Sequence, residues 1–157
     1  MRDVMYRLLM LLAVSLLVGC ASSPSDSRYQ EETANTLLMA EESYRHGLWS
    51  EAESYYQQLV DEKPELYQAW FRLGNIYARS GQLDAAVTMY ERCLELDPEQ
   101  ARGWYNLSVV RARQSLQLAM QAQQRFVGSS PAEAQQFSDF RDRMASALTG
   151  NSGKGTR

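Results

Sequence analysis

Residues 70–98 read WFRLGNIYARSGQLDAAVTMYERCLELDP, and this stretch contains two amphipathic helical patterns separated by a break at Ser80-Gly81. One face of the first pattern carries Trp70, Leu73, Gly74 and Tyr77, and one face of the second carries Ala86, Tyr90, Cys93 and Leu94. Pro98 ends the second pattern. The small residues Gly74 and Ala86 would let two helices approach closely. The stretch therefore predicts a helical hairpin with large aromatic rings on either side of the close approach.

This spacing resembles the tetratricopeptide repeat, a 34-residue helix-turn-helix unit with the signature W-x2-L-G-x2-Y, then A-x3-F/Y, then P. Each of those signature positions is filled between Trp70 and Pro98. A single repeat cannot bury its own apolar face, so neighbouring units are expected. The resemblance implies that the first helix of each unit lines a concave binding surface.

Comparison of the chain with itself, shifted by the length of one such repeat, finds those neighbours. The second helix of an earlier unit matches well, at Gly47, Ala52, Tyr56 and Pro64. A later unit keeps only the start of its first helix, at Trp104 and Leu107. The expected fold is all-α, a short TPR-like helical-hairpin array of about two and a half repeats, closed by a long helix and a C-terminal capping helix.

Break and cap signals predict the helix bounds. The expected helices cover about 33–45, 50–63, 65–79, 84–96, 99–127 and 131–148, and Ser50 is the expected N-cap of the second one. Trp70, Tyr77 and Tyr90 are expected to be largely buried. In the long helix Trp104 and Leu107 should face the preceding repeat, and a second apolar stripe runs from Tyr105 to Met120 and on towards Val127. This helix should therefore change partner along its length, and the last helix should fold back on it. Residues 33–149 would form this helical domain, and residues 150–157 a disordered tail.

The N-terminus has the pattern of a targeting segment. Arg2 and Arg7 precede an apolar run at residues 8–18, which is too short to span a bilayer stably. The run ends in Leu-Val-Gly-Cys20, which resembles the lipobox of bacterial lipoproteins, whose cysteine is lipidated. An ordinary signal peptide with an incidental cysteine is the alternative. The resemblance implies a signal peptide at 1–19, a lipidated Cys20 and, at 20–32, a flexible tether. It also implies, through Ala21, a periplasm-facing outer-membrane location in a Gram-negative cell.

Composition and charge exclude several classes of function. The net charge is −3, which argues against a nucleic-acid binder. Residues 21–100 carry fifteen acids and six bases, whereas residues 101–157 carry three acids and eight bases. His46 is the single histidine, and neither a catalytic constellation, a metal-ligand set nor a cofactor motif is apparent. If Cys20 is lipidated, Cys93 is left without a disulfide partner and is expected in the core.

The expected partner groove follows from helical phase, because its residues lie about 100–140° from the core stripe of each first helix. These residues are Leu37, Glu41, Tyr44, Gln68, Phe71, Asn75, Arg79, Arg102, Tyr105 and Val109. An apolar centre with polar flanks suits an extended peptide or a helix. The tether or the last helix could instead cover this stripe. Chaperone-binding members of the family carry Lys and Asn where Leu37 and Glu41 stand, so the resemblance does not extend to their carboxylate clamp.

The expected function is a non-enzymatic, membrane-anchored adaptor that binds protein partners of the cell envelope. The chain is similar to the lipoprotein pilotins and assembly factors of type IV pili and secretion systems. Two alternatives are a scaffold for peptidoglycan-processing enzymes and a carrier that binds a lipid or glycan.

The lipid anchor gives the first testable prediction. Cys20→Ala should abolish fatty-acid labelling and leave the protein unprocessed or soluble, because the thiol carries the lipid. Metabolic labelling with a tagged fatty acid measures this, and labelling that persists in the Cys20→Ala protein would refute the lipoprotein assignment.

Overall fold

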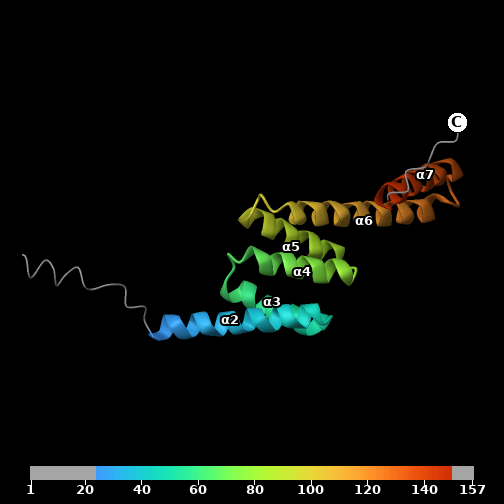
Figure 1. Cartoon of the computed structure of the whole chain (residues 1–157). Coiled ribbons are helices and arrows are strands. Elements are labelled where there is room, and N and C mark those ends of the chain that lie inside the picture. Colours follow the sequence, from blue (N-terminus) through green and yellow to red (C-terminus); the bar gives the residue numbers. More distant parts are fainter. Residues whose placement is uncertain (1–23, 150–157) are drawn as a thin grey trace, which may run out of the picture. The chain divides into compact units, whose positions relative to one another are not determined.

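The computed structural model describes residues 24–149 of the chain, and these residues form helices joined by short turns (Figure 1). The elements are α2 (Pro24–Arg45), α3 (Trp49–Glu62), α4 (Tyr67–Arg79), α5 (Leu83–Leu96), α6 (Ala101–Phe126) and α7 (Pro131–Leu148). The predicted all-α, TPR-like array is thereby confirmed. The predicted signal peptide, Cys20, the first residues of the tether and the C-terminal tail lie outside the described residues.

The described residues fall into two units that divide between Thr36 and Leu37, and α2 contributes to both. The predicted start of the first helix, Thr33, was wrong, because α2 begins at Pro24. Proline is tolerated in a first helical turn, where its missing N–H would have no intrahelical partner. Between there and Arg45 the sequence holds no glycine or further proline, and each added residue extends a helix at less cost than starting one. Part of the predicted tether is therefore helical.

The turns inside the two hairpins share one backbone geometry. Gly47 and Gly81 stand at equivalent positions of successive repeats and have φ of 72° and 80°. The next residue in each turn donates its N–H back across the turn, Leu48 to the Ser43 carbonyl and Gln82 to the Tyr77 carbonyl, both at 2.9 Å. This is a Schellman arrangement, in which glycine adopts the left-handed conformation that other residues disfavour. The turn ends one helix and sets the start of the next.

The turns between repeats also recur at equivalent positions. The Lys63 N–H donates to the Leu59 carbonyl at 2.8 Å, and the Asp97 N–H donates to the Cys93 carbonyl at 2.9 Å.

The predicted N-cap Ser50 was wrong. Leu48 holds the N-cap position of α3, and its carbonyl accepts the Ala52 N–H, while no side chain caps the helix.

The core consists of two clusters of buried side chains. The first lies among α2, α3 and α4, and it contains Ala40, Ala52, Tyr56, Leu59, Val60, Ala69, Leu73 and Ile76. The second lies among α5 and α6, and it contains Leu83, Ala86, Val87, Tyr90 and Val110. Tyr90 and Cys93 are buried as predicted, but Trp70 and Tyr77 are only partly buried. Trp70 keeps one edge at the surface because its indole nitrogen donates to the Pro64 carbonyl at 2.9 Å.

The long helix α6 and the helix α7 that packs on it are confirmed, but the predicted apolar stripe of α6 was wrong. Tyr105 and Met120 are exposed, whereas the buried positions are Gly103, Val110 and Ala119. The N-terminal half of α6 packs on α5, and the C-terminal half packs on α7 (Figure 1). There the Phe126 and Phe137 rings stack with centroids 5.9 Å apart. The predicted change of partner along this helix is therefore confirmed, although the residues of the second stripe were not the buried ones.

Within residues 24–149, no helix combines the length and apolar character that crossing a bilayer requires.

The close approach at Gly74 gives a prediction about stability. A Cβ at this position would lie 2.6 Å from Tyr90 Cε1 and 2.7 Å from Cδ1, and the buried ring has no room to move away. Overpacking of this kind costs about 1–3 kcal/mol, and the better helix propensity of alanine offsets about 1 kcal/mol. We expect Gly74→Ala to lower the free energy of unfolding measured in urea by up to about 2 kcal/mol.

Two matched glycines control this measurement. Gly103→Ala should cost less, because the atom nearest to the added carbon is a terminal methyl carbon of Leu94, at 2.9 Å, and not a buried ring. Gly128→Ala should be harmless, since no atom lies within 4 Å and its φ is not positive. Equal stability of all three variants would contradict the close approach of α4 and α5.

Candidate interaction surface

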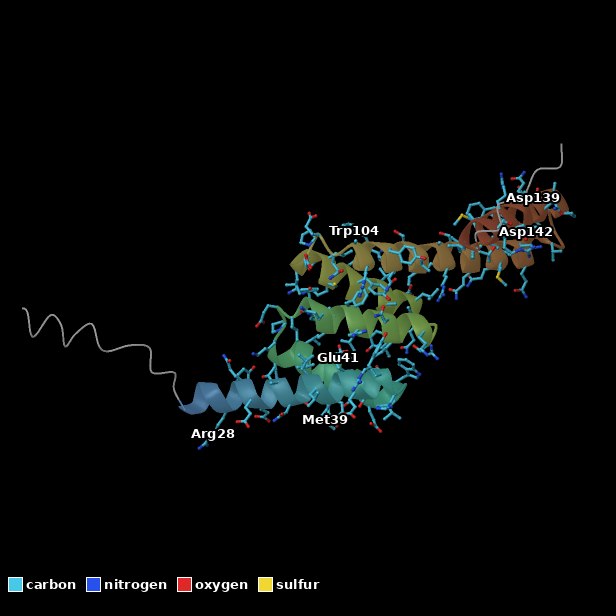
Figure 2. The ribbon with its side chains drawn as sticks, in the orientation of Figure 1. Arg28, Met39, Glu41, Trp104, Asp139 and Asp142 are labelled. Atoms are coloured by element: carbon cyan, nitrogen blue, oxygen red, sulfur yellow. The ribbon has the colours of Figure 1, made fainter. Side chains whose placement is uncertain are left out.

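A polar network joins α2, α3 and α4. The Tyr56 hydroxyl donates to Glu41 Oε1 at 2.8 Å. Arg72 donates through Nε to the same oxygen at 2.9 Å and through Nη2 to Glu41 Oε2 at 2.7 Å. The two bonds from Arg72 form a bidentate pair of the strong, charge-assisted kind. Figure 2 shows Glu41 on the side of α2 that faces α4, with Met39 on the opposite side.

A second network repeats the first at the equivalent positions of the next repeat, in α4, α5 and α6. The Tyr90 hydroxyl donates to Asn75 Oδ1 at 2.8 Å, and Asn106 Nδ2 donates to the same oxygen at 2.8 Å. A carboxylate and a guanidinium in the first network are thus replaced by two amides in the second. Both networks give each tyrosine hydroxyl an acceptor, and no buried side-chain nitrogen or oxygen of the described residues lacks a partner.

Burial and these partners shift the pKa values of the network. Burial raises the pKa of Tyr90 to about 12, and burial together with the Glu41 carboxylate raises the pKa of Tyr56. Burial by itself lowers the pKa of Arg72, but the hydrogen bonds and charge of Glu41 outweigh it, so the net shift is upward. Both tyrosines are therefore neutral donors at physiological pH.

The raised pKa of Tyr90 makes stability depend on pH in the alkaline range. Above the ordinary tyrosine pKa of 10 the unfolded chain loses the proton that the folded chain keeps. The contribution of Tyr90 to stability is therefore complete below pH 10 and falls as the pH rises towards 12.

A pocket of about 350 Å³ lies beside the first network. Its lining residues are Glu41, Tyr67, Gln68, Phe71, Arg72, Gln100 and Arg102. Four of the ten predicted groove residues, Glu41, Gln68, Phe71 and Arg102, meet here. Tyr67, Arg72 and Gln100 were not predicted. Arg72 is the counterpart of Asn106 one repeat earlier. Because neither residue was predicted, this relation becomes informative only when one of the two has been located in the structure.

The other six predicted groove residues lie elsewhere. Leu37 and Tyr44 pack against the first core cluster, and the Arg72 guanidinium lies 4.4 Å from the Tyr44 ring centroid. Arg79 covers the Trp49 ring at 4.4 Å. Asn75 is the acceptor of the second network. The remaining two lie on α6: Val109 is partly buried and Tyr105 is 70% exposed.

The last helix does not line this pocket. All its lining residues come from α2, α4, α6 or the turn before α6, whereas α7 packs on the C-terminal half of α6. Arg141 Nη1, for example, donates to Gln123 Oε1 at 2.9 Å. The alternative in which α7 covers the groove is therefore wrong for this part of it.

Chemistry at other side chains is limited. Among the residues that the structure describes, no group of three or more His, Cys, Asp or Glu side chains could hold a metal ion. Burial raises the pKa of the Cys93 thiol to about 11, so the thiol stays protonated and poorly nucleophilic at neutral pH.

Comparison with known proteins supports the repeat architecture. The family model Tetratricopeptide repeat matches residues 67–100. The fold is a tetratricopeptide-like array. A solved structure described as the "TPR2B-domain:pHsp70-complex of yeast Sti1" is similar, with a TM-score of 0.51 and 13% identity, over 74% of this chain and 98% of that chain. At this identity the likeness concerns the fold alone. A comparison with curated proteins gives no match.

The second network gives a prediction for a double-mutant cycle. Asn75→Leu removes the acceptor of the Tyr90 hydroxyl, whose side chain is only 1% exposed. A buried hydroxyl without a partner costs about 1–3 kcal/mol, and Tyr90→Phe removes this cost. Asn106 loses its acceptor in the single and the double variant alike, so its loss cancels in the comparison. We expect Asn75→Leu with Tyr90→Phe to be more stable towards urea than Asn75→Leu alone. Additive losses would show that the two side chains are not coupled.

Proposed function

We propose that this chain is a non-enzymatic adaptor, anchored to the outer membrane through Cys20, whose helical array binds a protein partner in the cell envelope. The specific role proposed is assembly of an envelope complex such as a pilus or secretion system. The tetratricopeptide-like fold supports the coarser part, because arrays of this type present extended binding surfaces. The lipobox-like sequence supports the anchor and the location.

The pocket at Arg102 is the observation that carries the proposal. It combines the rings of Tyr67 and Phe71 with the side-chain amides of Gln68 and Gln100. Arg102 is exposed at its edge and forms no ion pair or hydrogen bond with any residue from 24 to 149. Aromatic surface flanked by hydrogen-bonding groups and one available cation suits a peptide segment with an apolar residue near a carboxylate.

The partner of the similar yeast protein is not inferred for this chain. That structure is named as a complex with pHsp70. Here Glu41 occupies one of the two positions that carry Lys and Asn in the family's carboxylate clamp, and its carboxylate is bound to Arg72 and Tyr56. An added negative charge at this end of the pocket would face that carboxylate. The proposed partner therefore places its acidic group towards Arg102 and not towards Glu41.

A scaffold for peptidoglycan-processing enzymes would use the same surface and differs only in the identity of the partner. A lipid or glycan carrier has one observation in its favour. A pocket of about 470 Å³ between α6 and α7 is lined mainly by apolar side chains, among them Leu118, Phe137 and Phe140. Native mass spectrometry of the protein extracted from membranes would detect a co-purified lipid or glycan, which the adaptor proposal does not predict.

The adaptor proposal is tested by reversing charge at the pocket. Gln68→Glu with Arg102→Glu should strongly reduce recovery of partners in a pull-down from solubilised envelope, because it replaces the available cation with a carboxylate. Both side chains are exposed, so the helical circular-dichroism signal should not change. Phe71 is a poorer target, because its ring packs against Tyr90 with centroids 6.0 Å apart and truncation would damage the core.

The matched control is Gln124→Glu with Arg125→Glu, which makes the same charge change at two exposed positions near the other end of α6. It should recover the same partners as the natural sequence. If all three proteins recover the same partners equally, the pocket is not the binding site. Recovery of secretin, pilus or cell-wall proteins would distinguish the named roles.

A further inference from the structure

Trp104 lines a groove between α5 and α6 that has no part in the proposed function. The groove has a volume of about 360 Å³, and its lining residues are Glu91, Leu94, Glu95, Trp104 and Leu107. The Trp104 indole nitrogen donates to the Pro98 carbonyl at 2.8 Å, which orients the ring, yet the side chain is 53% exposed. Figure 2 shows Trp104 at the N-terminal end of α6. We refer to these five residues as the Trp104 groove.

The preceding repeat shows what normally covers such a tryptophan. Trp70, the counterpart of Trp104 in that repeat, makes the same bond to the Pro64 carbonyl, at 2.9 Å. There, however, the Arg92 guanidinium of α5 lies over the indole, 5.9 Å from the ring centroid. Met89, one helical turn before Arg92, packs against the same core cluster as Trp70. The second helix of the repeat thus places an arginine over Trp70 and an apolar residue against the core cluster on which Trp70 packs.

The same cover is absent at Trp104 within residues 24–149. The residues one repeat length after Met89 and Arg92 are Gln123 and Phe126, and both lie on α6 itself. They contact α7 instead, through Arg141 and Phe137. No cation of the described residues lies over the Trp104 ring, and no second helix of a third repeat follows α6 to lie against it.

Charge on the rim narrows the kind of occupant. Glu91 and Glu95 stand where the earlier repeat has Gln57 and Asp61, so this copy of the groove carries one more carboxylate. Arg111 binds Glu91 Oε1 and Arg92 binds Glu95 Oε2, each at 2.7 Å. The other oxygen of each carboxylate has no hydrogen bond from a residue between 24 and 149. Together with an aromatic face, these oxygens suit an arginine, which can stack on an indole and donate to carboxylates at once.

We propose that the Trp104 groove binds an amphipathic helix of a partner protein, which presents an apolar residue and, three positions later, an arginine. This helix takes the place that Met89 and Arg92 take in the preceding repeat, with its arginine over Trp104 and between Glu91 and Glu95. The Trp104 groove shares no lining residue with the pocket at Arg102. The inference therefore does not depend on the proposed function, and both surfaces could be occupied together.

The test uses a peptide that copies the natural cover. A helix-stapled peptide with the sequence of residues 83–96, carrying Cys93→Ala to prevent oxidation, is titrated into the purified protein. The chain has three tryptophans, and Trp104→Phe identifies the indole N–H resonance of Trp104 among them. We expect saturable movement of the Trp104 resonance, with the Trp49 resonance unchanged. The control peptide, which also carries Arg92→Glu, should bind at least fivefold more weakly.

A variant of the protein, as opposed to the peptide, tests the role of the two carboxylates on the rim. Glu91→Gln with Glu95→Gln should weaken binding of the arginine peptide by at least threefold. It should also reduce the difference in affinity between the arginine peptide and the Arg92→Glu control peptide. Both positions are exposed, so circular dichroism should report an unchanged fold. This variant leaves the Gln68 and Arg102 surface intact, so partner recovery through that pocket remains a separate measurement.

Three results would overturn the proposal. One is a Trp104 resonance that does not move with the peptide. Another is equal affinity for the arginine and glutamate peptides. The third is self-association in sedimentation that Trp104→Ala abolishes, because the occupant would then be a second copy of this chain and not a partner helix.

Discussion

The contact between the Tyr90 ring and the backbone at Gly74 is the constraint on which the repeat depends. Because Gly74 has no Cβ, α5 approaches α4 closely enough for the ring to lie against the helix. The hydroxyl then reaches Asn75, the next residue along α4. The first repeat has the same order, with the small residue Ala40 followed by the acceptor Glu41 for Tyr56. Close packing and hydrogen bonding are thus set by two adjacent residues in each repeat.

The two polar networks connect consecutive helices into one series. The first takes one side chain from each of α2, α3 and α4, and the second takes one from each of α4, α5 and α6. Helix α4 belongs to both, through Arg72 and Asn75. The first network is charged and partly exposed, so solvent screens it and its pair contributes modestly. The second is neutral. Because the tyrosines of both networks are fully buried, a lost acceptor leaves a costly unpaired hydroxyl in either one.

The sequence predicted the repeat because its determinants are local and recur at equivalent positions of successive units. Gly47 and Gly81 each indicate a turn in the sequence, and the positive φ angles of both residues agree with that role. Helix starts were harder to predict, because backbone bonds and not side-chain caps define them, as at Leu48. The continuation of α2 back to Pro24 was missed because a polar segment without periodicity gives no sign of a helix.

The pocket at Arg102 was predicted less completely, for a different reason. Helical phase places Glu41 and Asn75 on the expected face. It does not show that the hydroxyls of Tyr56 and Tyr90 already donate hydrogen bonds to the side-chain oxygens of these two residues. Phase also identifies first-helix residues only, so it misses Gln100, which stands in the turn before α6. Leu37 and Tyr44 were assigned to the groove by phase, and the structure instead packs them against the first core cluster.

One absent glycine accounts for how the array ends. The counterpart of Gly81 in the next unit is Ser115, which lies inside α6 and donates its hydroxyl to the Arg111 carbonyl at 3.1 Å. A serine adopts the left-handed backbone of Gly81 only at an energetic cost, so α6 continues where a third hairpin would turn. Continuation carries Gln123 and Phe126 away from the repeat and gives α7 a surface to pack on. It also leaves Trp104 without a following helix like α5, which lies against Trp70 through Arg92, so the exposed tryptophan and the packing of α7 on α6 have a single physical cause.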